Sequence, residues 1–139
     1  MARAASPLAT WSPVMLSVLR IVAALLLGEH GTQKLFDWPI PAQGGTPETF
    51  TLIWFAGVIE IVCGVLLVLG LFTRPAAFVA SGFAAAAYFI GHFNQGFWPV
   101  ANGGDAAILY CFVFLYIVFA GPGSLAVDAY FNRRRPLRV

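Results

Sequence analysis

VMLSVLRIVAALLLGEHGTQKLF, residues 14–36, joins a long apolar run to a sudden cluster of ionisable side chains. The apolar part contains a single charge, Arg20, and three ionisable residues then follow within one and a half helical turns: Glu29, His30 and Lys34. Such groups are costly at lipid depth unless protein or trapped water surrounds them. The stretch therefore predicts a membrane-spanning helix whose polar end is enclosed by further helices.

The composition of the whole chain indicates a membrane protein. Of its 139 residues, 60% are hydrophobic and 10% are charged, and the mean hydropathy is +0.82. Soluble domains are about 45–50% apolar and about 25% charged. Hydrocarbon about 30 Å thick needs roughly 20 helical residues, and four such segments fit: residues 13–36, 50–72, 76–97 and 105–121. Because little of the chain remains outside these segments, we expect residues 1–139 to form one domain.

The predicted fold class is all-α: an integral membrane, four-helix, up-down-up-down bundle, followed by a short interfacial helix over residues 124–132. Cytoplasmic loops carry an excess of Lys and Arg, and the arginines of this chain gather at the N-terminus, the second loop and the C-terminus. We therefore expect both termini to be cytoplasmic. The terminal arginines should contact anionic lipid rather than nucleic acid. No small-residue cleavage pattern follows Leu27, so we expect the first segment to stay attached.

Two charges within the predicted spans are candidates for a buried ion pair. At 100° per residue, Arg20 shares a helical face with Ser17, Ala24, Gly31 and Lys34, and small residues beside charges should look into the bundle. Glu60 lies near the middle of the second span, again among small residues. A rise of 1.5 Å per residue puts Arg20 and Glu60 about 9 Å apart in depth, within combined side-chain reach. We expect them to pair, which is compatible with a ligand-binding or proton-handling role of Glu60.

The other polar side chains gather in the outer third of the predicted bundle. They suggest a pocket that opens outward and narrows toward Glu60, and the set comprises Glu29, His30, Lys34, His92, Asn102 and Asp105. Structural alternatives stay open. Lys34 can snorkel to the headgroups, a neighbour can satisfy His30, and a helix dipole can stabilise Asp105. In the functional interpretation, His30 donates to a ligand carbonyl or shuttles a proton.

The sequence contains no motif of the common catalytic classes. HExxH, P-loop, GxGxxG, CxxC and nucleophile-elbow patterns are absent, so whether the chain is an enzyme stays open. Cys63 and Cys111 lie at depths that differ by roughly 10 Å, too far for a disulfide, and we expect free thiols. His30 and His92 lie at similar depths and could ligate a haem iron or a metal. We expect neither, because the surrounding charges would crowd an apolar macrocycle.

Short motifs in a fixed order along the chain resemble the DoxX family of small four-span bacterial membrane proteins. They run from Leu19-Arg20 to about Asp128, and include HGTQKLF (residues 30–36), Glu60, GLFTRPAA (70–77), His92, FWP (97–99), NGG (102–104) and GPG (121–123). The family takes its name from archaeal quinone-linked sulfur oxidation, and some members look like membrane partners of oxidoreductases. The resemblance implies a four-span fold in the bacterial cytoplasmic (inner) membrane and raises the prospect of redox or quinone chemistry.

Two hypotheses about function follow. In the first, the chain is a membrane subunit of a redox system, with a redox-protein partner or further copies of itself. It binds a quinone or similar small apolar carrier in the outer-side pocket, where His30 donates to a quinone carbonyl. In the second, the chain is a structural or assembly partner of a membrane oxidoreductase complex and has no ligand of its own. Its buried charges then serve only to fix the register of the helices.

Overall fold

The computed structural model describes residues 7–42 and 44–133, and every regular element within these ranges is helical. The α-helices are α1 (Pro7–Phe36), α2 (Leu52–Leu69), α3 (Thr73–Ala87), α4 (Pro99–Asn102), α5 (Asp105–Ala120) and α6 (Val127–Arg133). A π-helical turn, η1 (Tyr88–His92), and a 3-10 turn, η2 (Phe93–Gln95), continue α3. The expected all-α class is confirmed.

Three helical stretches of the described chain are long and apolar enough to cross a membrane: Leu8–Phe36, Leu52–Leu69 and Thr73–Gln95. This arrangement is compatible with a membrane helical bundle. The helix in the fourth expected position, α5, is equally apolar in character but has only 16 residues. Crossing of the membrane by α5, and with it the four-span topology, stays a prediction.

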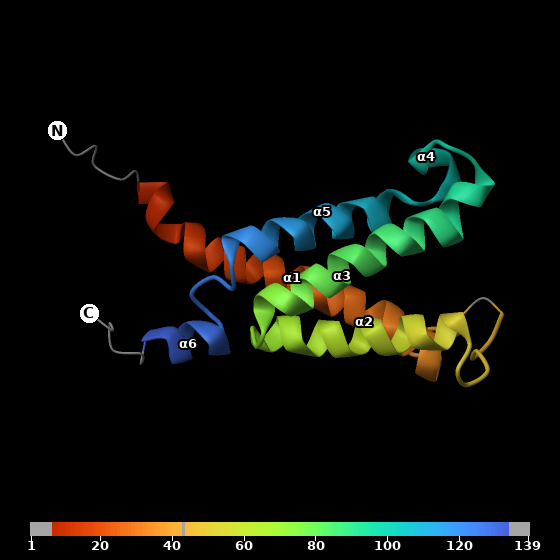
Figure 1. Cartoon of the computed structure of the whole chain (residues 1–139), viewed down its shortest axis with the longest axis horizontal. Coiled ribbons are helices and arrows are strands. Elements are labelled where there is room, and N and C mark those ends of the chain that lie inside the picture. The colour runs from red at the N-terminus through yellow and green to blue at the C-terminus, as the bar shows by residue number, and fades with distance from the viewer. Residues whose placement is uncertain (1–6, 43, 134–139) are drawn as a thin grey trace.

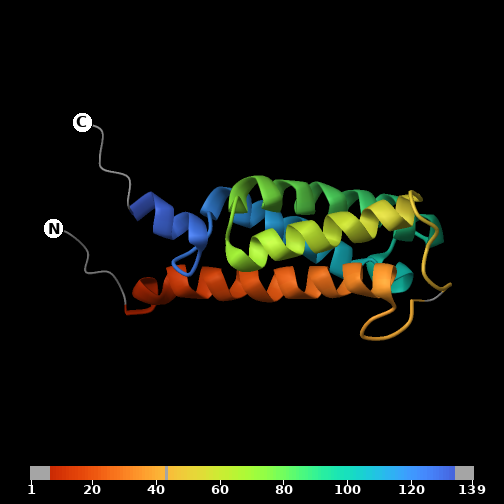
Figure 2. The same ribbon diagram turned by 90° about the horizontal axis from the view of Figure 1, so that it is seen from below.

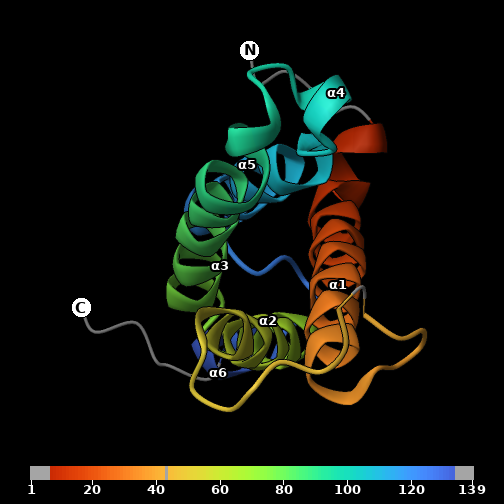
Figure 3. The same cartoon turned by 90° about the vertical axis from the view of Figure 1, so that its right-hand side faces the viewer.

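Four helices surround the centre of the molecule. Seen end-on in Figure 3, α1, α2, α3 and α5 follow one another around a ring. α1 packs mainly on α2, and α3 packs mainly on α5, whereas α1 and α5 share the smallest of the four neighbouring interfaces. The start of α1 lies at the same end of the molecule as α6, and α4 lies at the opposite end (Figures 1 and 2). We call these the α6 end and the α4 end.

Helix α2 is shorter than the predicted segment 50–72 at both ends. It begins at Leu52, where the Thr51 hydroxyl caps it by accepting a hydrogen bond from the Trp54 amide at 3.3 Å. It ends at Leu69 because Gly70 takes a left-handed conformation with φ 68°, which glycine adopts without a steric penalty. Thr46 lies in the loop before α2.

Helix α3 begins at Thr73, three residues before the predicted segment 76–97, because a distant carboxylate caps it. The Asp128 side chain accepts hydrogen bonds from the amides of Phe72 at 3.1 Å and Thr73 at 2.8 Å. The Asp128 amide in turn donates to the Gly70 carbonyl at 2.9 Å. The expected short C-terminal helix is thus present as α6, and it clamps the turn between α2 and α3. Its position at the membrane interface stays a prediction.

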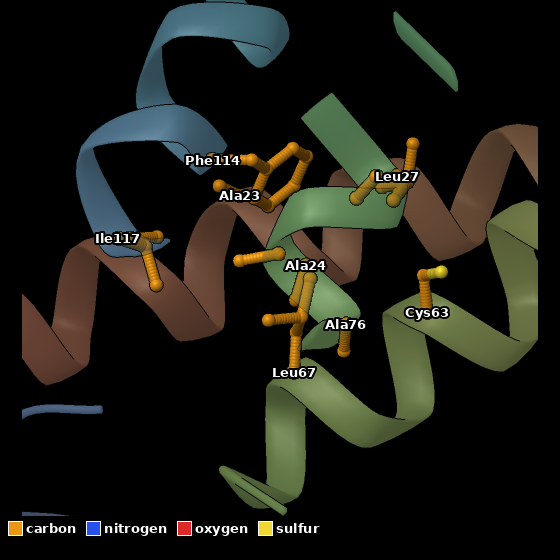
Figure 4. Packing of buried hydrophobic residues seen from close by; sticks show 10 residues of the cluster. Ala23, Ala24, Leu27, Cys63, Leu67, Ala76, Phe114 and Ile117 are labelled. Carbon is orange, nitrogen blue, oxygen red and sulfur yellow. The ribbon is translucent and has the colours of Figure 1, made fainter. Parts of the chain in front are cut away.

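Small residues let the helices approach closely. The buried cluster joins α1, α2, α3 and α5 and includes Ala23, Ala24, Leu67, Ala76, Phe114 and Ile117 (Figure 4). At the crossing of α1 and α2, a Cβ added to Gly31 would lie 2.8 Å from the Gly57 carbonyl oxygen and 2.7 Å from Cγ1 of Ile61. This contact between backbones fixes the register in which α1 presents its polar side chains to α2.

Candidate functional site

The polar centre of the bundle is an ion pair between Lys34 and Glu60. Nζ of Lys34 lies 2.6 Å from Oε1 and 2.7 Å from Oε2 of Glu60, so the ammonium group spans both carboxylate oxygens. The Glu60 side chain is 6% exposed and that of Lys34 is 28% exposed. The glycine crossing brings the two helices together here, since a Cβ on Gly57 would lie 3.3 Å from Cβ of Lys34. Lys34 is therefore held inside the bundle.

The expected ion pair between Arg20 and Glu60 was wrong. Arg20 is completely buried toward the α6 end. Its guanidinium donates to four backbone carbonyl oxygens: Leu67, Val68 at 3.0 Å, Pro122 at 2.9 Å and Leu125 at 2.5 Å. The physical reason is that α2 ends at Leu69 and leaves its last carbonyls without partners in the helix. Arg20 satisfies them and binds the loop after α5 to α1.

The face of α1 that carries these charges was predicted correctly. Ser17, Arg20, Ala24 and Gly31 are all buried, in accord with an inward orientation. Ser17 also stabilises the loop after α5, because its hydroxyl accepts a hydrogen bond from the Leu125 amide at 3.0 Å. The error in the predicted pair therefore concerns the partner of each charge and not the face on which the charges lie.

His30 lies at the narrow interface between α1 and α5. Its imidazole is exposed, and its ring meets the ring of Tyr110 edge-on, with centroids 6.2 Å apart and planes at 86°. Tyr110 stacks on Phe114 with centroids 5.9 Å apart and planes at 10°. We call this arrangement of His30, Tyr110 and Phe114 the α1–α5 seam. It places an exposed imidazole beside the partly buried ring of Tyr110, with Phe114 buried behind that ring.

His92 and Asn102 belong to a separate network in the chain between α3 and α5. His92 Nδ1 lies 3.0 Å from the Asn102 carbonyl oxygen. The Asn102 side chain is buried, donates to the Gly96 carbonyl at 2.7 Å and accepts from the Gly104 amide at 2.8 Å. These bonds hold the connection in shape. Among the described residues, no group of three or more His, Cys, Asp and Glu side chains is placed to hold a metal ion.

A groove of about 600 Å³ runs along the outward surface of α1 and α2. Its lining is mostly apolar, with Glu29 and Thr32 as hydrophilic side chains of α1 and with Trp38 and Pro39 from the following loop. Glycines form its floor, because a Cβ on Gly64 would lie only 3.2 Å from Cα of Gly28. Sequence reasoning missed this groove. The available signal was the pair of glycines, Gly28 and Gly64, one on each of the two neighbouring helices.

The remaining candidates lie apart. Asp105 is exposed in the first turn of α5, where the helix dipole favours a carboxylate. Cys63 is buried and Cys111 is partly buried, and both are free thiols as expected. The structure thus distributes the predicted single pocket over an interior ion pair, the seam with His30, the groove with Glu29, and the loop network of His92 and Asn102.

The loop after α1 is closed by the carboxylate of Asp37. Asp37 accepts a hydrogen bond from the Thr46 hydroxyl at 2.6 Å and another from the Ala42 amide at 3.1 Å. These bonds, first that from Thr46, hold the pKa of the Asp37 carboxyl below its usual value. Since Trp38 and Pro39 follow directly, the closed loop positions the end of the groove.

Comparisons with known proteins find a matching family and similar proteins in several bacteria. The model of the DoxX family matches residues 15–93. An uncharacterised protein of Haemophilus influenzae is 46% identical over 89% of this chain and 96% of its own length. An inner membrane protein of Escherichia coli, YphA, is 29% identical over 84% of this chain and 89% of its own length. A membrane protein of Mycobacterium tuberculosis is 27% identical over 88% of this chain and 84% of its own length. No solved structure matches significantly.

Proposed function

Because the chain belongs to the DoxX family of membrane proteins, we propose that it is a membrane subunit of a redox system and binds a quinone at the α1–α5 seam. The observation that carries this proposal is the exposed imidazole of His30, which meets the partly buried ring of Tyr110 edge-on, with Phe114 buried behind that ring. The imidazole offers a donor to a quinone carbonyl, and the accessible part of the Tyr110 ring suits contact with a flat ring. We therefore place the quinone at this seam rather than in the wider outer-side pocket expected from the sequence.

Access to this position supports the assignment. α1 and α5 share the smallest interface between neighbouring helices of the ring, so a carrier dissolved in the bilayer reaches His30 with little displacement of helix contacts. The Lys34–Glu60 pair lies one turn further along α1 and supplies charges that can exchange a proton when a ligand alters their surroundings. No redox partner is needed for binding itself, and electron transfer would be the task of an associated protein or of a second copy.

The membrane topology belongs to the same proposal. We place α1, α2, α3 and α5 as four crossings of the bacterial inner membrane, with the α6 end and both termini cytoplasmic. Sixteen residues of α5 span about 24 Å, which a locally thinner bilayer accommodates. Cysteines introduced at Thr46 and Ala101 should react with an impermeant thiol reagent from outside, and Asn132→Cys should not. Labelling of position 132 alone would reverse the orientation.

Quinone binding can be measured with the protein in nanodiscs, by titration with ubiquinone and menaquinone analogues of short tail. We expect His30→Phe, which keeps a ring but removes the donor, to weaken binding about tenfold, the value of one good hydrogen bond. His30→Gln keeps a donor and should lose less. Glu48→Gln, which removes an exposed carboxylate in the loop before α2, is the matched control and should leave quinone affinity unchanged.

Other outcomes assign the chain differently. Equal quinone affinity in the parent protein and both His30 variants would contradict the proposal. It would favour the second candidate, a structural or assembly partner, which rests on the complete engagement of Arg20, Lys34 and Glu60 in contacts within the chain. A Soret band, or stoichiometric metal lost in both His30→Ala and His92→Ala, would instead establish a cofactor site.

A further inference from the structure

Glu29 is the charged side chain in an otherwise apolar setting. It lies in the groove between α1 and α2, and its side chain is exposed on the outward surface. The groove is bordered by apolar residues that face outward, among them Leu25, Val65 and Leu69. Glu29 precedes the end of α1 at Phe36 by two turns, which is roughly 10 Å along the helix axis. In a membrane, this carboxylate faces lipid.

The charge of Glu29 has no ion-pair partner among the described residues. The cations nearest to it in sequence are engaged elsewhere, Lys34 with Glu60 and Arg20 with backbone carbonyls. His30 interacts with it electrostatically, but the imidazole lies against Tyr110 on another face of α1. A carboxylate that faces hydrocarbon is costly unless a cation accompanies it. An occupant of the groove that carries a positive charge would remove this cost.

We propose that the α1–α2 groove binds a lipophilic organic cation, a phosphonium or quaternary ammonium ion with apolar substituents. The charge lies beside Glu29, and the substituents fill the apolar length of the groove. Its volume of about 600 Å³ falls within the range of small-molecule sites. Trp38, which lines the groove, adds an aromatic face of the kind that attracts cations.

A neutral occupant fits the same space less well. A lipid acyl chain or the tail of a quinone matches the apolar lining but leaves Glu29 without a counter-charge. The glycine floor also argues for a bulky guest, since Gly28 leaves open space where a side chain would lie and Gly64 is buried where α1 and α2 approach closely. This site differs from the seam that carries the proposed quinone function, because Glu29 and His30 occupy different faces of α1.

The probe is tetraphenylphosphonium, titrated into the full chain in phosphatidylcholine nanodiscs, with empty nanodiscs to subtract partition into lipid. Tetraphenylborate has almost the same shape and the opposite charge. We expect the phosphonium to bind at one site per chain and the borate to bind at least tenfold more weakly. Glu29→Gln should weaken phosphonium binding about tenfold, which corresponds to about 1.4 kcal/mol, and Glu29→Asp should keep part of the affinity.

A second variant tests the groove without changing charge. A Cβ on Gly28 meets no atom within 4 Å, so Gly28→Leu should fold normally, fill the groove and abolish phosphonium binding. His30→Phe should leave that binding unchanged, which separates this site from the quinone proposal. Equal affinity in the parent, Glu29→Gln and Gly28→Leu proteins would overturn the inference. So would a Val65→Cys protein that an added oxidant links into disulfide dimers equally well with and without the phosphonium, because the groove would then belong to a second copy.

Discussion

The two buried charge networks should behave as independent units when they are mutated. Lys34 and Glu60 contact each other directly, whereas Arg20 contacts carbonyl oxygens of α2 and of the loop after α5. Removing one member of a buried ion pair costs about 3–5 kcal/mol because its partner is left uncompensated. Since Lys34 is 28% exposed, water relieves part of that cost, and we expect about 2–3 kcal/mol for Lys34→Met.

Double-mutant cycles turn this into a sharp test. Lys34→Met and Glu60→Gln together should cost less than the sum of the two single changes, with a coupling of about 1–2 kcal/mol. Arg20→Met and Glu60→Gln share no partner and should add within about 0.5 kcal/mol. Unfolding in mixed micelles with increasing SDS, followed by circular dichroism, gives each free energy. Coupling in the Arg20 cycle with none in the Lys34 cycle would refute the assignment of partners.

Three further outcomes can be checked directly. Arg20→Met leaves four carbonyl oxygens without their donor and should destabilise the fold by about 3–5 kcal/mol, measured in the same SDS titration. Asp128→Asn removes the carboxylate that caps Thr73 and should lower the free energy of unfolding by about 1 kcal/mol. Amide hydrogens at the start of α3 should show the largest increase in exchange rate, and protection equal to that of the parent protein there would contradict the cap. The pKa of Asp37 is lowered in the folded protein, so its carboxylate stabilises the closed loop fully above the pKa of an unfolded aspartate, about 3.9. This stabilisation is lost as the pH falls through the lower pKa of the folded state. Trp38 fluorescence should report this change, and Asp37→Asn should shift the fluorescence to its acid value at neutral pH.

Hydropathy and helical periodicity predicted much of the architecture. The end of α1 at Phe36 and the start of α5 at Asp105 coincide with the expected boundaries. The inward face of α1 was also predicted, because small residues beside charges recur at helical spacing. These features depend on residues close together in the sequence. Composition along a helix is sufficient to define them.

The errors arise where distant backbone groups act as partners. Counting helical rise compares depths but gives no direction around the bundle axis, so it paired Arg20 with Glu60. The actual acceptors are carbonyl oxygens at the end of α2, which Gly70 exposes by its left-handed conformation. Because every residue has a backbone carbonyl, the sequence does not indicate which carbonyl oxygens will accept these hydrogen bonds. The early start of α3 has the same origin, since Asp128 caps it from 55 residues away.

The position of α1 in the ring explains how one helix can carry sites of different chemistry. Successive residues point 100° apart, so Glu29 faces the groove while His30 faces α5. Lys34, one turn beyond His30, reaches α2 inside the bundle. A quinone at the seam and a cation in the groove would then share the backbone of α1 without sharing a contact. Their binding energies should therefore add, apart from the electrostatic interactions of Glu29 with His30 and Tyr110. Titration of each ligand in the presence of the other should shift affinity less than about threefold. A larger shift would mean that the two ligands compete for one site.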